Sequence, residues 1–130
     1  MIRRFLTVLV FVCAIVAFMP AIARPQNAAK SSMITQSYQI AFCRLPGDVE
    51  LKYWMAQNDG RVTNLQTLLK AHRDWLRTQE PEKHQVTVRA YQQALGRVPN
   101  NSELATWNQR LSQGNTNCED IVNILRRGGR

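Results

Sequence analysis

The sequence contains an internal duplication, and this feature constrains the fold more than any other. When the chain is shifted by 53 residues, 33–77 aligns with 86–130 without a gap, and 12 of the 45 aligned positions are identical. Two of the three tryptophans, Trp54 and Trp107, are among the identities. Self-similarity at a fixed spacing indicates a repeated structural unit. Because about 45 residues are too few to bury a good core alone, we expect the two units to pack on each other.

Five identical positions form a motif in each unit. They are Tyr38, Arg44, Pro46, Glu50 and Trp54 in the first unit, and Tyr91, Arg97, Pro99, Glu103 and Trp107 in the second. Each arginine precedes its glutamate by six residues, which favours an internal tie between the end of one helix and the start of the next. A duplicated anion site is the alternative. The two tryptophans lie beside leucines, so we expect core positions, with a cleft between the units as the alternative.

Helical spacing of apolar residues predicts three short helices in each unit. Expected helices cover 34–44, 48–58 and 65–76, and then 86–96, 102–113 and 118–125. The expected caps are Asp48, Asn64, Asn101 or Ser102, and Asn117, since short polar side chains accept hydrogen bonds from the first turn of a helix. No stretch alternates with period two. The predicted fold class is therefore all-α, with two tandem three-helix repeats packed as one small helical domain.

The first 23 residues predict a signal peptide. Arg3 and Arg4 precede an apolar run of about fifteen residues, and 21–23 read Ala-Ile-Ala, a small-residue cleavage pattern. A membrane span needs roughly 20 apolar residues, so export by the Sec route with cleavage after Ala23 is favoured over a retained anchor. The remaining chain is then expected to comprise a flexible segment 24–31, repeat 32–78, linker 79–84, repeat 85–127 and a basic tail 128–130.

Two cysteines remain after cleavage, Cys43 and Cys118. In an oxidising compartment they are candidates for a disulfide. Two separate buried thiols are the alternative, because free cysteine is a common core residue.

No constellation for catalysis or for metal binding is evident. The two histidines, His72 and His84, and the two cysteines are scattered, whereas zinc ligands stand at tight spacing. No nucleophile, base and orienting group can be picked out together. We therefore expect neither an enzyme nor a cofactor, and the pattern does not favour a small-molecule substrate.

Basic residues exceed acidic ones. Lysines and arginines number 17 against 9 acids in the whole chain, and loss of Arg3 and Arg4 leaves 15 − 9, a net charge of +6. Candidate contacts for an anion or a partner are Lys70, Arg73, Trp75, Arg77, Arg126, Arg127 and Arg130. An anionic polysaccharide or lipid surface would attract such a chain, and a merely soluble basic surface is the alternative. Export and the lack of a basic–aromatic recognition motif argue against nucleic acid. Trp75 has no aromatic counterpart in the second unit. Either it packs the first unit onto the second or it is exposed, and exposure would make it the best single candidate for a partner contact.

The second unit carries a recognisable motif. Its residues are Tyr91, Ala94, Leu95, Gly96, Arg97, Pro99, Glu103, Leu104, Trp107 and Gly114. This pattern resembles the bacterial helical domain of unknown function 4214, which occurs in secreted and surface proteins, and it is similar to the core motif of phycobilisome linker domains. The first unit departs from it at Phe42 and at Cys43, where the pattern has leucine and glycine. The resemblance implies an extracytoplasmic location and a scaffold or interaction role, and nothing indicates a bilin.

These observations together predict an exported, non-catalytic protein-interaction or scaffold module in the periplasm or at the cell surface. Its expected partner is an envelope or surface protein. The alternative is an electrostatic binder of anionic surface polysaccharide or membrane lipid, which rests on the basic excess.

Overall fold

The computed structural model describes residues 25–128, and every regular element in this range is helical. The elements are α1 (Pro25–Phe42), α2 (Asp48–Ala56), the short 3-10 helix η1 (Gly60–Val62), α3 (Leu65–Leu76), α4 (Glu80–Leu95), α5 (Asn101–Ser112) and α6 (Cys118–Gly128). The predicted all-α class is confirmed. The predicted signal peptide, 1–23, and Arg130 lie outside the described residues. Within 25–128, no helix combines the length and the hydropathy needed to cross a membrane.

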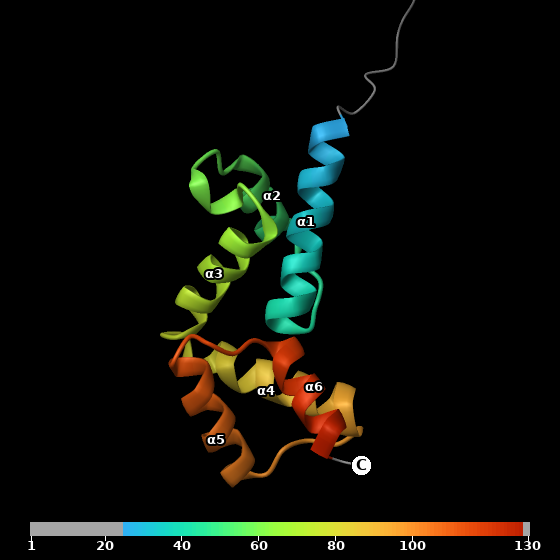
Figure 1. Ribbon diagram of the computed structural model, residues 1–130, viewed down its shortest axis with the longest axis vertical. Coiled ribbons are helices and arrows are strands. Elements are labelled where there is room, and N and C mark those ends of the chain that lie inside the picture. The colour runs from blue at the N-terminus through green and yellow to red at the C-terminus, as the bar shows by residue number, and fades with distance from the viewer. Residues whose placement is uncertain (1–24, 129–130) are drawn as a thin grey trace, which may run out of the picture.

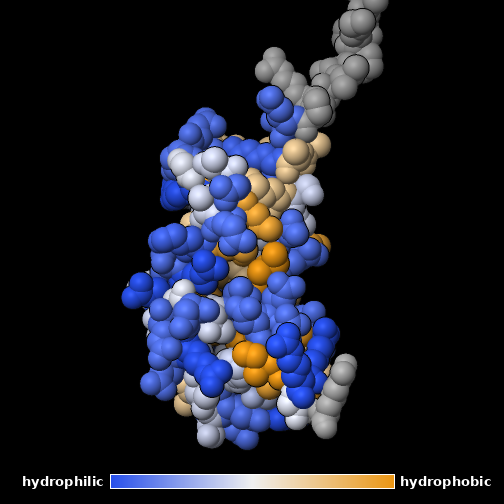
Figure 2. Space-filling view, in the orientation of Figure 1, coloured by the Kyte–Doolittle hydropathy of each residue, from blue (hydrophilic) through white to orange (hydrophobic). Residues whose placement is uncertain are grey.

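The helices form two tiers that share one core. Figure 1 shows α1, α2 and α3 in the upper tier and α4, α5 and α6 in the lower one. In the upper tier α1 packs on α2 and α3, and in the lower tier α4 packs on α5 and α6. The two tiers also meet where α1 contacts α6. The fully buried side chains of Ile34, Leu68, Val86 and Ile121 belong to one hydrophobic cluster. The face of the molecule shown in Figure 2 is mostly hydrophilic, and its apolar residues gather over α1 and over the α4–α6 region.

Two segments that we expected to lie outside the helices are helical. The described part of the expected flexible segment, 25–31, is the first part of α1, and most of the expected linker 79–84 is the first turn of α4. Proline is favourable in a first helical turn, where its missing N–H is not needed, and Pro81 occupies such a position in α4. These helix starts are largely polar, so they show no apolar stripe by which a helix is predicted from sequence.

The predicted helix caps are partly confirmed. The side chain of Asn64 accepts a hydrogen bond from the Thr67 N–H at 3.0 Å, and that of Asn117 accepts from the Asp120 N–H at 3.0 Å. The cap of α2 is Gly47, where Asp48 was expected. The cap of α5 is Asn100, where Asn101 or Ser102 was expected. In both cases a glutamate in the first turn accepts a hydrogen bond from the backbone N–H of the cap residue, at 2.8 Å.

Cys43 and Cys118 form a disulfide, which excludes the alternative of two separate thiols. Their Cα atoms lie 5.6 Å apart, and the bond joins the end of α1 to the start of α6, and so the upper tier to the lower. Cys43 has φ 52, the one positive value at a non-glycine residue within 25–128. Gly96, at the aligned position after α4, has φ 67. The backbone therefore turns the same way at both places, and the first unit uses a cysteine where glycine is conformationally favoured.

Candidate functional site

The motif residues of the two units make the same contacts. The indole N–H of Trp54 donates to the Tyr38 hydroxyl at 3.0 Å, and that of Trp107 donates to the Tyr91 hydroxyl at 3.1 Å. All four side chains are buried. The tryptophans are therefore core residues, as expected, and each locks the first helix of its unit to the second.

The paired arginines form internal ties. Arg44 donates to both carboxylate oxygens of Glu50 at 2.7 Å, and Arg97 donates to those of Glu103 at 2.9 and 2.7 Å. Each guanidinium also lies over the tyrosine ring of its own unit, 5.2 and 5.1 Å from the ring centroid. The Arg97 guanidinium, together with the backbone N–H of Asn100, lowers the pKa of Glu103 to about 2. Both arginines are thus engaged within the chain, as the internal-tie interpretation predicts.

We expect Arg44→Ala to lower the melting temperature more than Arg97→Ala. The side chain of Arg44 is 29% exposed, whereas that of Arg97 is 50% exposed, and solvent screens an exposed ion pair. Arg44 also lies 3.7 Å from a second carboxylate, that of Glu82. Thermal denaturation of the two variants in parallel measures the difference. Equal shifts would show that burial does not distinguish the two ties.

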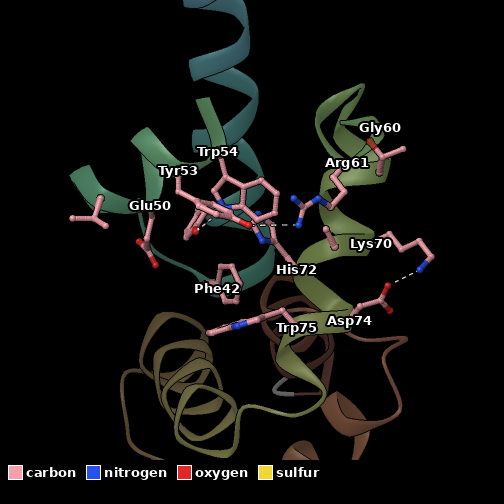
Figure 3. A pocket seen from close by; sticks show the side chains of 14 residues that line it. Phe42, Glu50, Tyr53, Trp54, Gly60, Arg61, Lys70, His72, Asp74 and Trp75 are labelled. Carbon is pink, nitrogen blue, oxygen red and sulfur yellow. Dashed lines mark hydrogen bonds and ion pairs between the residues drawn. The ribbon is translucent and has the colours of Figure 1, made fainter. Parts of the chain in front are cut away.

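A groove of about 770 Å³ lies between α2 and α3, at the centre of Figure 3. Buried rings form its floor, from Tyr38, Phe42, Trp54 and His72. Large side chains line its rim and are exposed to solvent: Val49 to 82%, Tyr53 to 49% and Trp75 to 48%. Ligand sites in proteins are concave, mostly apolar and of this size, so the groove is the candidate site of this chain.

The floor of the groove is packed around the imidazole of His72. The ring centroid of His72 lies 4.7 Å from that of Tyr38, 5.0 Å from that of Phe42 and 5.1 Å from that of Trp54, each in an edge-on arrangement. Trp75 extends from α3 beneath Phe42, with ring centroids 5.9 Å apart. Edge-to-face packing is the favourable geometry for such rings, so the floor is a preformed aromatic surface.

His72 is neutral and has a hydrogen-bond partner. Its Nε2 lies 3.0 Å from the Ser37 hydroxyl, which itself donates to the carbonyl of Ile34 at 2.7 Å. The Ser37 hydroxyl proton is thus engaged in the bond to Ile34, so the Ser37 oxygen acts as the acceptor for His72. The imidazole proton therefore lies on Nε2, and this N–H donates a hydrogen bond to Ser37. Burial lowers the pKa of His72 to about 4. His72 is therefore a core residue.

Every charged residue that lines the groove is paired within the chain. Glu50 is bound by Arg44, Arg61 contacts Asp59 at 2.6 Å, and Lys70 contacts Asp74 at 2.5 Å. Figure 3 shows the Lys70 and Asp74 side chains turned toward each other. The groove thus offers an apolar surface with no unpaired charge at its rim.

The predicted contact residues lie at separate places rather than in one patch. Lys70 and Trp75 line the groove, and Arg77 packs on Gly114 and donates to the carbonyl of Ser112 at 3.4 Å. Arg126 lies beside a second cavity, of about 540 Å³, that also borders Cys43. Arg73 is partly buried and Arg127 is exposed. Of the members of this set that lie within 25–128, only Lys70 and Trp75 line the groove.

Sequence reasoning missed two rim residues, Val49 and Tyr53, although the duplication contained a signal for them. At the positions aligned with Val49, Tyr53 and Trp75, the second unit has Ser102, Thr106 and Gly128. Large side chains therefore stand at these three positions in the first unit alone.

Lys83 was not singled out from the sequence either. Its side chain is almost fully buried, pairs with Glu80, and donates to the Ser112 hydroxyl at 2.5 Å and to the Arg77 carbonyl at 3.2 Å. At the aligned position, Lys30 donates to the carbonyls of two residues at the end of α2, at 2.9 and 2.6 Å. Both lysines therefore hold the end of a neighbouring helix and have a structural role.

No family model matches the chain, and no similar protein is found among the curated proteins or the solved structures. Among residues 25–128, no group of three or more His, Cys, Asp or Glu side chains is arranged to hold a metal ion. The resemblance to the domain of unknown function 4214 therefore stays a prediction from the motif.

Proposed function

We propose that this chain is an exported, non-catalytic protein-interaction or scaffold module of the bacterial envelope, built from two tandem three-helix repeats. The observation that carries the proposal is the groove between α2 and α3, whose rim exposes a tryptophan, a tyrosine and a valine over an aromatic floor. Tryptophan and tyrosine are the residue types most enriched among the contacts that dominate protein interfaces. The first unit is the docking unit in this proposal, because it alone has these side chains at the rim positions.

Two further observations support the repeat and the location. Helices α1 and α4 end at aligned positions, as do the starts of α2 and α5 and the starts of α3 and α6. A disulfide is typical of proteins that fold in an oxidising compartment, which agrees with the predicted signal peptide. The motif resemblance favours the same location.

The partner in this proposal is an envelope or surface protein that presents an uncharged, apolar segment. Burying a charged side chain of the partner against the groove would leave that charge without a counterion, since the rim charges are already paired. Apolar contact is insensitive to salt, whereas attraction between exposed charges is screened at high ionic strength. Salt therefore separates this proposal from the alternative of an anionic polymer or lipid.

We expect Trp75→Ala to abolish retention of the partner with little loss of stability, because the ring is about half exposed. The measurement is an affinity pull-down of the mature chain from the native envelope, washed at low and then at high salt. Wild-type protein should retain a stoichiometric protein at high salt, and Trp75→Ala should not. Val98→Ser is the matched control, since Val98 is 62% exposed but lies in the turn between α4 and α5.

Two outcomes contradict the proposal. Equal retention by Trp75→Ala and wild type would exclude the groove as the docking site. Loss of all protein at high salt, with binding of anionic polymer or lipid at low salt, would instead support the electrostatic alternative and direct mutagenesis to Arg126 and Arg127.

A further inference from the structure

The rim of the groove carries two hydrogen-bond donors that have no acceptor among the described residues. The Tyr53 hydroxyl accepts a long bond of 3.5 Å from Arg61, and so its own proton is not used in that contact. The indole N–H of Trp75 makes no hydrogen bond within 25–128, and the bonds from the Thr78 side chain and N–H go to the backbone carbonyl of Trp75. By contrast, the indole N–H of Trp54, on the floor, is bound to Tyr38. An occupant that covers the rim must therefore supply acceptors, because a donor buried without a partner is costly.

The modes by which proteins bind peptides differ in the acceptors they offer. In a helix the backbone carbonyls are bonded internally, so a helical occupant would leave both rim donors unpaired. Addition of a strand to a sheet edge needs a strand, and the residues from 25 to 128 form none. Recognition of phosphate or acidic motifs needs free cations, and Arg61 and Lys70 at the rim are both paired. A polyproline II segment makes no internal hydrogen bonds, so its carbonyls are available.

We propose that the groove binds a proline-rich segment of the partner protein in the polyproline II conformation. This inference rests on the proposed function and specifies the chemistry of the partner. Proline rings pack against the exposed rings of Tyr53 and Trp75, and the carbonyls of the segment accept from the Tyr53 hydroxyl and the Trp75 indole. The segment is uncharged where it enters the groove, because the rim charges are paired. Its fixed backbone dihedral lowers the entropy lost on binding.

Two variants test the donors without removing the rings. Trp75→Phe and Tyr53→Phe each keep an aromatic ring and delete one donor. Isothermal titration calorimetry of the purified, oxidised protein would use two capped, uncharged peptides of equal length. One has prolines spaced three residues apart with leucines between them, and the other is a helix-forming peptide of alanine, leucine and glutamine. Val98→Ser is again the control, and thermal denaturation verifies that each variant is folded.

We expect the proline-rich peptide to bind and the helical peptide to bind at least tenfold more weakly. Each donor deletion should raise the Kd for the proline-rich peptide roughly two- to tenfold, the range of a single hydrogen bond, and Val98→Ser should leave it unchanged. Wild-type affinity in both phenylalanine variants would overturn the inference, and so would tighter binding of the helical peptide or no binding of the proline-rich one.

The outcome for this inference is separable from that for the proposed function. If Trp75→Ala loses the envelope partner while Trp75→Phe and Tyr53→Phe bind the proline-rich peptide with wild-type affinity, the groove is a docking site for an apolar segment of another kind. In that case the proposed function stands and the proline-rich partner is wrong. If Trp75→Ala retains the envelope partner, the proposed function itself is wrong.

Discussion

Reduction of the Cys43–Cys118 disulfide is expected to lower the free energy of unfolding by about 4 kcal/mol. The two cysteines are separated by 75 residues along the chain. Without the bond, the unfolded chain regains the entropy that closure of a loop of this size removes, and this sets the magnitude. Denaturant unfolding of the oxidised and reduced protein, followed by circular dichroism, measures the difference. Equal midpoints in the two states would show that the bond does not stabilise the fold.

Matched variants separate the cross-link from the backbone conformation at its first residue. Cys43→Gly with Cys118→Ala removes the bond and keeps a residue that adopts positive φ freely. Cys43→Ala with Cys118→Ala removes the same bond but places a β-carbon in the left-handed region observed at Cys43. We expect the alanine pair to be less stable than the glycine pair by roughly 0.5–1 kcal/mol, after allowance for the greater entropy of unfolded glycine. The opposite order would mean that the turn relaxes to negative φ once the bond is absent.

The positions of the apolar helices were predictable because their apolar residues recur at helical spacing. Helix α3 carries Leu68, Leu69 and Leu76 on its buried face, and this spacing predicts a helix without reference to the rest of the chain. The first turns of α1 and α4 were not predictable in this way. Their residues are polar and are held by contacts to distant segments, such as the bonds from Lys30 to the end of α2.

The candidate site was predictable only in part. Trp75 stands out in the sequence because the second unit has no aromatic residue at the aligned position. The floor was not predictable, since it depends on packing between α1, α2 and α3, which brings Ser37 to His72 across 35 residues of chain. The free indole donor of Trp75 could not be recognised either, because the same group is bonded at Trp54, where it donates to the Tyr38 hydroxyl. Which hydrogen bonds are satisfied is a property of the tertiary structure.

The pairing of the two cysteines illustrates a second limit. Sequence permits either a disulfide or two buried thiols, and the choice depends on the distance between the end of α1 and the start of α6. That distance follows from the packing of the two tiers, on which local patterns carry no information. The glycine at the aligned position, Gly96, is the one local sign that the backbone at Cys43 is unusual.

Acidification is expected to destabilise the protein through His72. In the folded state burial lowers the pKa of this imidazole to about 4, from an ordinary value of 6.5 in the unfolded chain. The unfolded state therefore binds a proton first as the pH falls. The contribution of neutral His72 is fully present above pH 6.5 and is lost progressively between pH 6.5 and 4. Between pH 7.5 and 4.5 the free energy of unfolding should fall by roughly 2–3 kcal/mol from this group alone.

His72→Leu provides the control for this prediction. Leucine occupies the aligned position in the second unit, Leu125, and Ser37 keeps its hydrogen bond to Ile34 when the imidazole is removed. Glu50 and Glu103 also have lowered pKa values, but their contribution to the free energy of unfolding is lost mainly below pH 4.5. Urea unfolding at pH 7.5 and at pH 4.5 should therefore show a much smaller loss of stability in His72→Leu than in wild type. Identical losses in the two proteins would mean that other groups cause the acid sensitivity and that His72 is protonated without cost.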